Sequence, residues 1–223
     1  MFLHEIIKGA DPAHLVFEGD AVVTYGELEK TVARYRNTLY EMGVRQGERV
    51  GLYTANRAEF VYVFMAVVSL GAIIIPINNS LVDREVDYIL RDSGSMLLTV
   101  LEVSCPSIGI HDLDYKTKKE IAPAAPDFPE DVTEDDVCAL VYTSGTTGSP
   151  KGAMLTHRNL VSNVEQYLQR ITFVPEDKVL CVLPMFHAYG LTTVVNAGLY
   201  AHATIVILRS KSPSEITNTI VEH

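Results

Sequence analysis

Short apolar segments alternate with amphipathic segments along the first half of the chain, and this alternation is the strongest constraint on its fold. Segments rich in β-branched or other apolar residues lie at 49–53, 72–77 and 96–101. Asn56 with Glu59 predicts a capped helix between the first two, and 83–93 predicts a helix that stops at Gly94. Strands separated by helices pair in parallel through crossover connections. The predicted fold class is therefore α/β, with parallel-rich sheets flanked by helices.

The residues before this alternation predict a hairpin and one long helix. Apolar segments at 14–17 and 21–24 flank a Glu-Gly-Asp turn. Thr24 and Glu27 form a capping box, which starts a helix that runs to about residue 42. Gly43 supplies the left-handed residue that ends such a helix.

One uncharged run, Phe60 to Ile77, is eighteen residues long and reaches the lower limit for a membrane-spanning helix. Gly71 and Pro76 interrupt it, and the residues between them are rich in isoleucine. A buried helix, a glycine stop and a buried strand explain this pattern better than a membrane span. We predict no transmembrane segment, and leave open a peripheral contact with a membrane surface.

Prolines and acidic residues fill the middle of the chain, where no periodicity persists. This divides the chain into a first α/β section at 1–103, a connection at 104–135 and a second α/β section at 136–223. The predicted strands of the second section are 138–142, 178–183 and 204–208. Its predicted helices are 157–171, 187–200 and one starting at 212, which is so short that we expect the chain to be truncated at its C-terminus.

Composition excludes several classes of protein. With 48% apolar residues the chain is too hydrophobic to be disordered. With 18 basic and 28 acidic residues it lacks the broad basic surface of a nonspecific nucleic-acid binder. Cys105, Cys138 and Cys181 are few and widely spaced, which favours a reducing cytoplasm over a disulfide framework. No histidine has the spacing of a zinc ligand set, so no metal-binding residue is predicted.

Chemistry is concentrated in Thr143–Gly152, which directly follows the predicted strand 138–142. These ten residues contain five hydroxyl side chains, three glycines and Lys151. Glycines let the backbone approach a ligand closely, hydroxyl groups donate to phosphate oxygens, and a lysine adds positive charge. The segment therefore suits a polyphosphate, although a solvated Ser/Thr/Gly loop has the same composition. Its glycine spacing is not that of a P-loop.

The specific string favours the ligand site. Residues 142–159, including Leu155-Thr-His-Arg-Asn159, closely resemble the signature loop of the adenylate-forming enzymes, the superfamily of acyl-CoA synthetases, peptide-synthetase adenylation domains and firefly luciferase. The rest of the chain resembles the same family through Thr24-Tyr25 with Leu28, Gly47–Val50, Gly71-Ala72, Pro76–Asn78 and Leu183–Gly190. The whole chain is most similar to an N-terminal fragment of a bacterial fatty-acyl-CoA ligase.

The resemblance implies a reaction and its co-substrates. Such enzymes use ATP and Mg²⁺ to convert a carboxylic acid into an acyl-adenylate and pyrophosphate, and the acyl-CoA synthetases then transfer the acyl group to coenzyme A. The expected partners are therefore a fatty acid, ATP and coenzyme A, in the cytoplasm. Preorganised donors aimed at the phosphate oxygens would lower the barrier of the first step.

The resemblance also assigns roles to residues. The residues expected to bind the phosphates of ATP are Thr143, Ser144, Gly145, Thr146, Thr147, Gly148 and Lys151. Thr143, Lys151 and His187 are the expected catalytic residues. Phe186, His187, Tyr189 and Gly190 are expected to bind the acid. The competing interpretations are a solvated lysine at 151 and a packing role for the aromatic residues.

In the family, the magnesium, ribose and catalytic-lysine residues belong to segments beyond the length of this chain. We therefore expect the 223-residue fragment alone to be inactive. The alternatives are a degenerate nucleotide- or acyl-binding module, another acid-activating adenylation domain, or an unrelated P-loop ATPase or kinase. The acyl chain length and the oligomeric state are left open.

Overall fold

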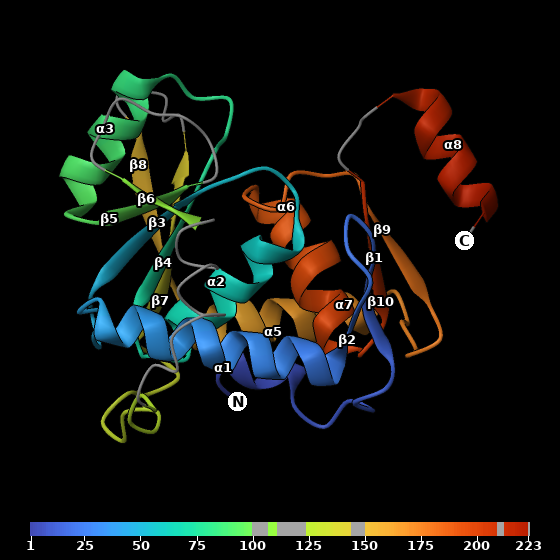
Figure 1. Cartoon of the computed structure of the whole chain (residues 1–223), viewed down its shortest axis with the longest axis horizontal. Coiled ribbons are helices and arrows are strands. Elements are labelled where there is room, and N and C mark those ends of the chain that lie inside the picture. The colour runs from blue at the N-terminus through green and yellow to red at the C-terminus, as the bar shows by residue number, and fades with distance from the viewer. Residues whose placement is uncertain (100–106, 111–123, 144–149, 209–211, 223) are drawn as a thin grey trace.

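The computed structural model describes residues 1–99, 107–110, 124–143, 150–208 and 212–222 of the chain. Its elements are two sheets and the helices around them (Figure 1). In chain order they are η1 (Leu3–Ile7), β1 (Leu15–Gly19), β2 (Val23–Thr24), α1 (Tyr25–Glu41), β3 (Arg49–Tyr53), α2 (Ala58–Val68), β4 (Ile73–Ile77), α3 (Asp83–Ser93), β5 (Met96–Thr99), β6 (Ile108–Gly109), β7 (Val137–Thr143), β8 (Lys151–Thr156), α5 (His157–Leu168), β9 (Lys178–Cys181), α6 (Ala188–Gly190), η2 (Leu191–Asn196), α7 (Ala197–Tyr200), β10 (Thr204–Ile207) and α8 (Pro213–Glu222).

The larger sheet has the strand order β6-β5-β3-β4-β7-β8. All its neighbouring pairs are parallel except β7 and β8, which are antiparallel. The smaller sheet has the order β2-β1-β10-β9, in which β1, β10 and β9 are parallel and β2 is antiparallel to β1. The predicted fold class, α/β with parallel-rich sheets flanked by helices, is confirmed.

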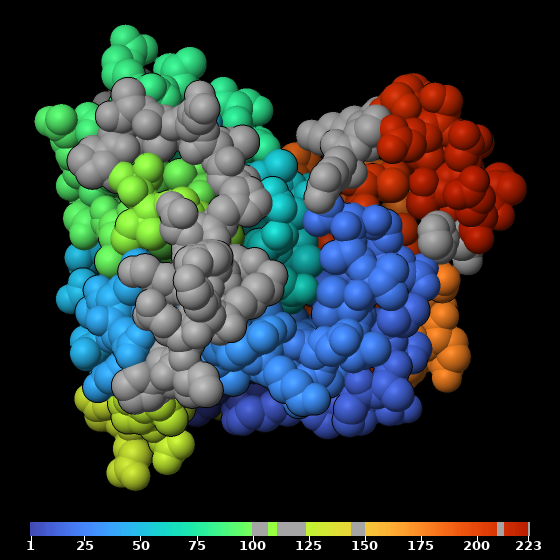
Figure 2. All heavy atoms as spheres, viewed as in Figure 1, coloured from blue at the N-terminus to red at the C-terminus, as the bar shows by residue number. Residues whose placement is uncertain are grey.

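Both sheets combine strands from before and after the predicted 104–135 connection. In the smaller sheet β1 lies beside β10, and in the larger sheet β4 pairs with β7 through Ile74 and Ala139. Figure 2 shows residues near the N-terminus (blue) beside residues near the C-terminus (red) on one face of the molecule. The described part of 104–135 contributes β6, which extends the larger sheet. The three-part division of the chain stays a prediction.

Helix α2 is the centre of the core. Nine of its residues are buried, from Ala58 through Val68, and α1 packs along it. A helix that is apolar on every side is stable only where it is covered on every side. Gly71 has φ +69° and β4 follows it, as the run from Phe60 to Ile77 predicted. Within the described ranges, every helix is too short or too polar to cross a bilayer.

The capping signals predicted at both ends of α1 and at the end of α3 are confirmed. Thr24 Oγ1 accepts from the Glu27 amide at 3.3 Å, and Glu27 Oε2 accepts from the Thr24 amide at 2.9 Å. The predicted stops also have left-handed backbone, with φ +96° at Gly43 and +65° at Gly94. α3 has the predicted bounds, Asp83–Ser93.

The predicted cap at Asn56 is wrong. α2 begins at Ala58, and its N-cap residue, Arg57, makes no side-chain capping bond. The Asn56 side chain instead bonds to backbone groups that follow β9. Because β9 ends at Cys181 and not at the predicted Leu183, those groups have no strand partner, and buried backbone groups need one.

Two other segments differ from the sequence expectations. β8 was not predicted: it returns antiparallel to β7 directly after the Gly/Ser/Thr-rich segment. α5 ends at Leu168 rather than 171, and the predicted helix 187–200 contains the π-helical turn η2. Both buried cysteines, Cys138 and Cys181, are free thiols, and burial raises the pKa of each to about 12.

Candidate functional site

A cavity of about 720 Å³ opens at the carboxyl ends of strands in the larger sheet. Residues 76–78 at the end of β4 and 141–143 at the end of β7 form one wall, α3 forms a second, and residues 186–188 form a third. Ligands of parallel α/β sheets bind at this edge, because the loops and helix termini that can reach them gather there. The cavity is therefore the candidate site.

The structure places the two ends of the predicted phosphate-binding segment side by side. Thr143 is the last residue of β7, is exposed and lines the cavity. Lys151 is the first residue of β8, is exposed and lies opposite Thr143 in the antiparallel pair. The other predicted members lie outside the described residues; they are Ser144, Gly145, Thr146, Thr147 and Gly148.

Helix α3 contacts both ends of this segment. Tyr142 donates to Asp92 Oδ2 at 2.6 Å, and Tyr88 donates to the Pro150 carbonyl at 3.4 Å. Burial, reinforced by the neighbouring Asp92 carboxylate, raises the pKa of Tyr142. Gly152 lies against the Tyr142 ring, where an added Cβ would be 3.0 Å from a ring carbon. Tyr142 therefore fixes the end of β7 from two sides.

We expect Tyr142→Phe to lower the free energy of unfolding by about 1 kcal/mol, because it removes a short hydrogen bond to a carboxylate at a partly solvated position. The longer bond of Tyr88 makes Tyr88→Phe the matched control, with a smaller loss. Urea unfolding of both variants and of Asp92→Asn measures the effect. An equal loss in Tyr142→Phe and Tyr88→Phe would contradict the importance of the Asp92 contact.

The turn after β9 brings the predicted acid-binding residues to the same cavity. Phe186 and His187 line it, with Phe186 half-buried and His187 exposed. The His187 amide donates to the Pro184 carbonyl at 3.1 Å, and His187 Nδ1 accepts from the Tyr189 amide at 3.2 Å. With Nδ1 acting as acceptor, the neutral ring carries its proton on Nε2, which is left as a donor.

The remaining two residues of the predicted acid site lie elsewhere. Tyr189 is 60% exposed, and neither it nor Gly190 is part of the cavity wall. Gly190 is buried against the preceding turn, where an added Cβ would be 2.4 Å from the Pro184 carbonyl oxygen. This close approach explains a glycine at 190 through packing.

Several cavity residues were missed by the sequence reasoning as site residues: Asn78, Arg84, Tyr88 and Tyr142. Asn78 and Tyr142 had a usable signal, since each stands at or directly after the end of a buried strand. Arg84 and Tyr88 had none, because an exposed polar face of a helix is the ordinary pattern. In the described parts of the chain, no three His, Cys, Asp or Glu side chains gather in a way that could hold a metal ion.

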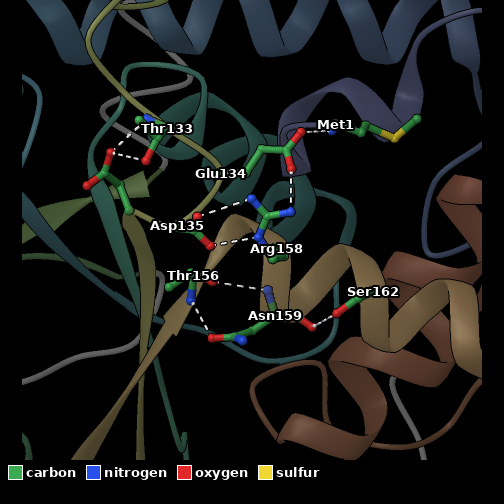
Figure 3. A network of polar contacts seen from close by, with 9 residues as sticks. Met1, Thr133, Glu134, Asp135, Thr156, Arg158, Asn159 and Ser162 are labelled. Carbon is green, nitrogen blue, oxygen red and sulfur yellow. Dashed lines mark hydrogen bonds and ion pairs between the residues drawn. The ribbon is translucent and has the colours of Figure 1, made fainter.

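The far end of β8 is a structural junction (Figure 3). Thr156 caps α5 through a reciprocal pair of 3.1 Å bonds with Asn159. Arg158 pairs with Asp135 at 2.7 Å and with Glu134 at 3.1 Å, and the Met1 ammonium also contacts Glu134. The 155–159 part of the motif therefore anchors β8 to α5 at the end of the strand opposite Lys151.

Comparison with known proteins finds a matching family and similar sequences. Residues 7–223 match the family of AMP-binding enzymes. Feruloyl-CoA synthase of an Amycolatopsis species is 34% identical over 212 residues, which are 93% of this chain and 43% of that protein. Long-chain-fatty-acid–CoA ligase FadD13 of Mycobacterium tuberculosis is 31% identical over 217 residues, 91% of this chain and 43% of the relative. The chain thus spans less than half the length of these relatives.

Solved structures show the same fold. The N-terminal domain of FACL13 from Mycobacterium tuberculosis superposes with a TM-score of 0.87 at 28% identity, covering 99% of this chain and 60% of that one. The o-succinylbenzoate-CoA synthetase MenE of Bacillus subtilis, in complex with its acyl-adenylate intermediate, gives 0.87 at 29% identity, with 99% and 59% covered. ATP-bound MatB from Rhodopseudomonas palustris gives 0.86 at 27% identity, with 99% and 48% covered.

Proposed function

Because the chain belongs to the AMP-binding enzyme family, we propose that it is the N-terminal portion of an ATP-dependent fatty acid–CoA ligase. The first half-reaction joins a carboxylate oxygen to the α-phosphorus of ATP, and pyrophosphate leaves with the electrons of the broken P–O bond. The acyl group then passes to the thiol of coenzyme A, which releases AMP. The observation that carries the proposal is that Thr143, at the end of β7 in the larger sheet, and His187, in the turn after β9 of the smaller sheet, line one cavity.

Charge and hydrogen bonding define what these residues do in the proposal. The Thr143 hydroxyl and the Lys151 ammonium, adjacent across β7 and β8, meet the phosphates. The Nε2–H of His187 donates to the carboxylate oxygen from the opposite wall. Phe186 covers the apolar part of the acid. Ser144, Gly145, Thr146, Thr147 and Gly148 remain proposed phosphate ligands, and Tyr189 and Gly190 remain proposed neighbours of the acid.

Mg²⁺, coenzyme A and a cytoplasmic location belong to this proposal as well. Mg²⁺ would neutralise phosphate charge when it is bound with ATP, and we assign no described residue to it. The identity of the acid is the finer part of the proposal. The similarity to feruloyl-CoA synthase supports a second candidate, an aromatic acid, beside the fatty acid supported by the similarity to FadD13.

ATP–pyrophosphate exchange tests the function. We expect exchange that depends on added acid in the full product of the reading frame, assayed with decanoate, palmitate and ferulate in parallel. We propose that the 223-residue chain alone gives none, so robust exchange by it would contradict that part. If both the full-length protein and the 223-residue chain bind ATP but neither catalyses exchange with any of the acids, the non-catalytic module is favoured.

Lys151→Met should lower the exchange rate by about 10- to 100-fold, since it removes one ionic contact to a phosphate that gains charge in the transition state. Because Lys151 is exposed, the melting temperature of the Lys151→Met variant should stay close to that of the parent protein. Lys30→Met, an exposed lysine of α1, is the matched control for the change in net charge. An equal effect of both variants would show that Lys151 acts only through the overall charge.

A further inference from the structure

Asn56 is half-buried in the connection between β3 and α2, and it contacts the backbone of the segment that follows β9. Its Nδ2 donates to the Leu183 carbonyl at 2.8 Å, and its Oδ1 accepts from the Met185 amide at 2.9 Å. A third, longer contact joins Nδ2 to the Cys181 carbonyl at 3.5 Å. A single side chain therefore satisfies both a donor and an acceptor of this segment.

These contacts join the two sheets. Asn56 follows the carboxyl end of β3 in the larger sheet, and residues 183–185 follow the carboxyl end of β9 in the smaller one. Figure 1 shows the beginning of α2 beside α6, between the two sheets. A primary amide suits this place because it offers a donor and an acceptor on one rigid plane. The carboxamide bridges a gap that neither sheet's ladder closes.

The bridge leads directly to His187. Met185, whose amide donates to Asn56 Oδ1, lies two residues before His187. The turn between them is closed by the His187 amide, which donates to the Pro184 carbonyl at 3.1 Å. His187 Nδ1 in turn accepts from the Tyr189 amide at 3.2 Å. Packing of Gly190 against the Pro184 carbonyl holds the same turn from its other side. The position of the His187 imidazole therefore depends on a short series of contacts that begins at Asn56.

We propose that Asn56 is a positioning residue for the acid site: it holds the 183–187 turn so that Nε2 of His187 donates into the cavity. Asn56 itself does not line that cavity, so it acts through the turn. The proposal rests on the proposed function for its catalytic meaning. Its structural part, that the Asn56 contacts determine the order of the His187 turn, stands independently.

Asn37 provides a matched control. It is also a half-buried asparagine whose side chain makes a long-range bond to backbone, with Oδ1 accepting from the Ala125 amide at 2.9 Å. It lies on α1, outside the cavity wall. Asn37→Ala and Asn56→Ala therefore remove comparable groups, and only the second should affect the site.

Hydrogen exchange of the 223-residue chain tests the structural part without any activity. We expect Asn56→Ala to speed exchange of the Met185 and Tyr189 amides at least tenfold, while Asn37→Ala leaves both unchanged. Asn56→Asp, which keeps the acceptor for Met185 but loses the donor to Leu183, should give an intermediate increase and covers the case that the alanine variant does not fold. An unchanged Tyr189 amide in a folded Asn56 variant would overturn the proposal.

Kinetics of the full product test the catalytic part. Asn56→Ala should raise the KM for the acid at least tenfold and leave the KM for ATP within twofold. In a His187→Ala background the same substitution should change the acid KM no further. Equal changes in both KM values, or full additivity with His187→Ala, would overturn positioning through His187. Absence of exchange in the parent protein would defeat the proposed function, while the hydrogen-exchange result would still decide the structural part.

Discussion

Gly19→Ala will lower the free energy of unfolding by about 3 kcal/mol, because it adds both backbone strain and a steric clash. Gly19 has φ +87°, where a residue with a Cβ is strained by about 1–2 kcal/mol. An added Cβ would also lie 2.4 Å from the Ile207 carbonyl oxygen, a backbone atom of the neighbouring strand that cannot rotate away. Overpacking of this kind costs about 1–3 kcal/mol. Urea unfolding measures the sum.

Gly9→Ala separates the two costs. Gly9 has nearly the same backbone, φ +83°, but an added Cβ there meets nothing within 4 Å. We expect Gly9→Ala to lose only about 1 kcal/mol, the cost of the left-handed backbone. Equal losses in the two variants would show that β1 and β10 can separate without cost.

The close approach at Gly19 concerns the site as well as the fold. Gly19 pairs with Ile207, and β10 pairs with β9 through Ile207 and Cys181. The His187 turn begins immediately after β9. A displaced β10 should therefore move the wall of the cavity formed by residues 186–188, and Gly19→Ala should also speed exchange of the Met185 amide.

The elements that the sequence predicted best carry their own local signals. α3 was predicted to the residue because Gly94 ends it with left-handed backbone. The start of α1 was predicted because Thr24 and Glu27 form its capping box. β8 was missed because its segment, Lys-Gly-Ala-Met-Leu-Thr, has no regular alternation, and all six of its residues are exposed or half-buried. Residues 151–156 form a strand because they pair with β7, and this pairing is not encoded in the local pattern of the segment itself.

Long-range contacts account for the misses at the site. The local pattern of Asn56 and Glu59 predicted a cap, but the Asn56 amide bonds to groups more than 120 residues away. The cavity that Thr143 shares with His187 likewise depends on how the two sheets close together. The sequence predicted which kinds of residue form the site. It did not predict that they lie close together in space, except through the resemblance to a family.

Acidification from pH 7 to pH 5 should destabilise the protein by about 3 kcal/mol, and much of this loss traces to His157. Only 1% of His157 is exposed, and its Nδ1 accepts from the Leu3 amide at 3.2 Å, which holds η1 against α5. Burial lowers its pKa to about 4. Burial likewise lowers the pKa of His4 to about 4, beside the rings of Phe2 and Phe128.

The sign follows from which state binds the proton. Both pKa values are lower in the folded protein than the ordinary 6.5, so between pH 6.5 and pH 4 the unfolded chain binds protons that the folded chain excludes. The stability is complete above pH 6.5 and is lost as the pH falls towards 4. At pH 5 a fully buried histidine of this kind accounts for about 2 kcal/mol, and half-buried His4 for less. The pKa of the Asp136 carboxyl, which accepts from Thr133, is lowered from an ordinary 3.8, so the stability that this group contributes is lost only at lower pH.

His157→Asn isolates the contribution of one ring. Asparagine keeps an acceptor for the Leu3 amide but cannot be protonated in this range, so we expect the loss between pH 7 and pH 5 to fall by about 2 kcal/mol. The smaller side chain costs stability at both pH values, and the difference between them cancels that cost. Urea unfolding at each pH measures it, with His4→Asn as the companion variant. If His157→Asn has the same pH dependence as the parent, the His157 ring of the folded parent must be protonated or reach water in this range. The contact between η1 and α5 would then not depend on the neutral form of His157.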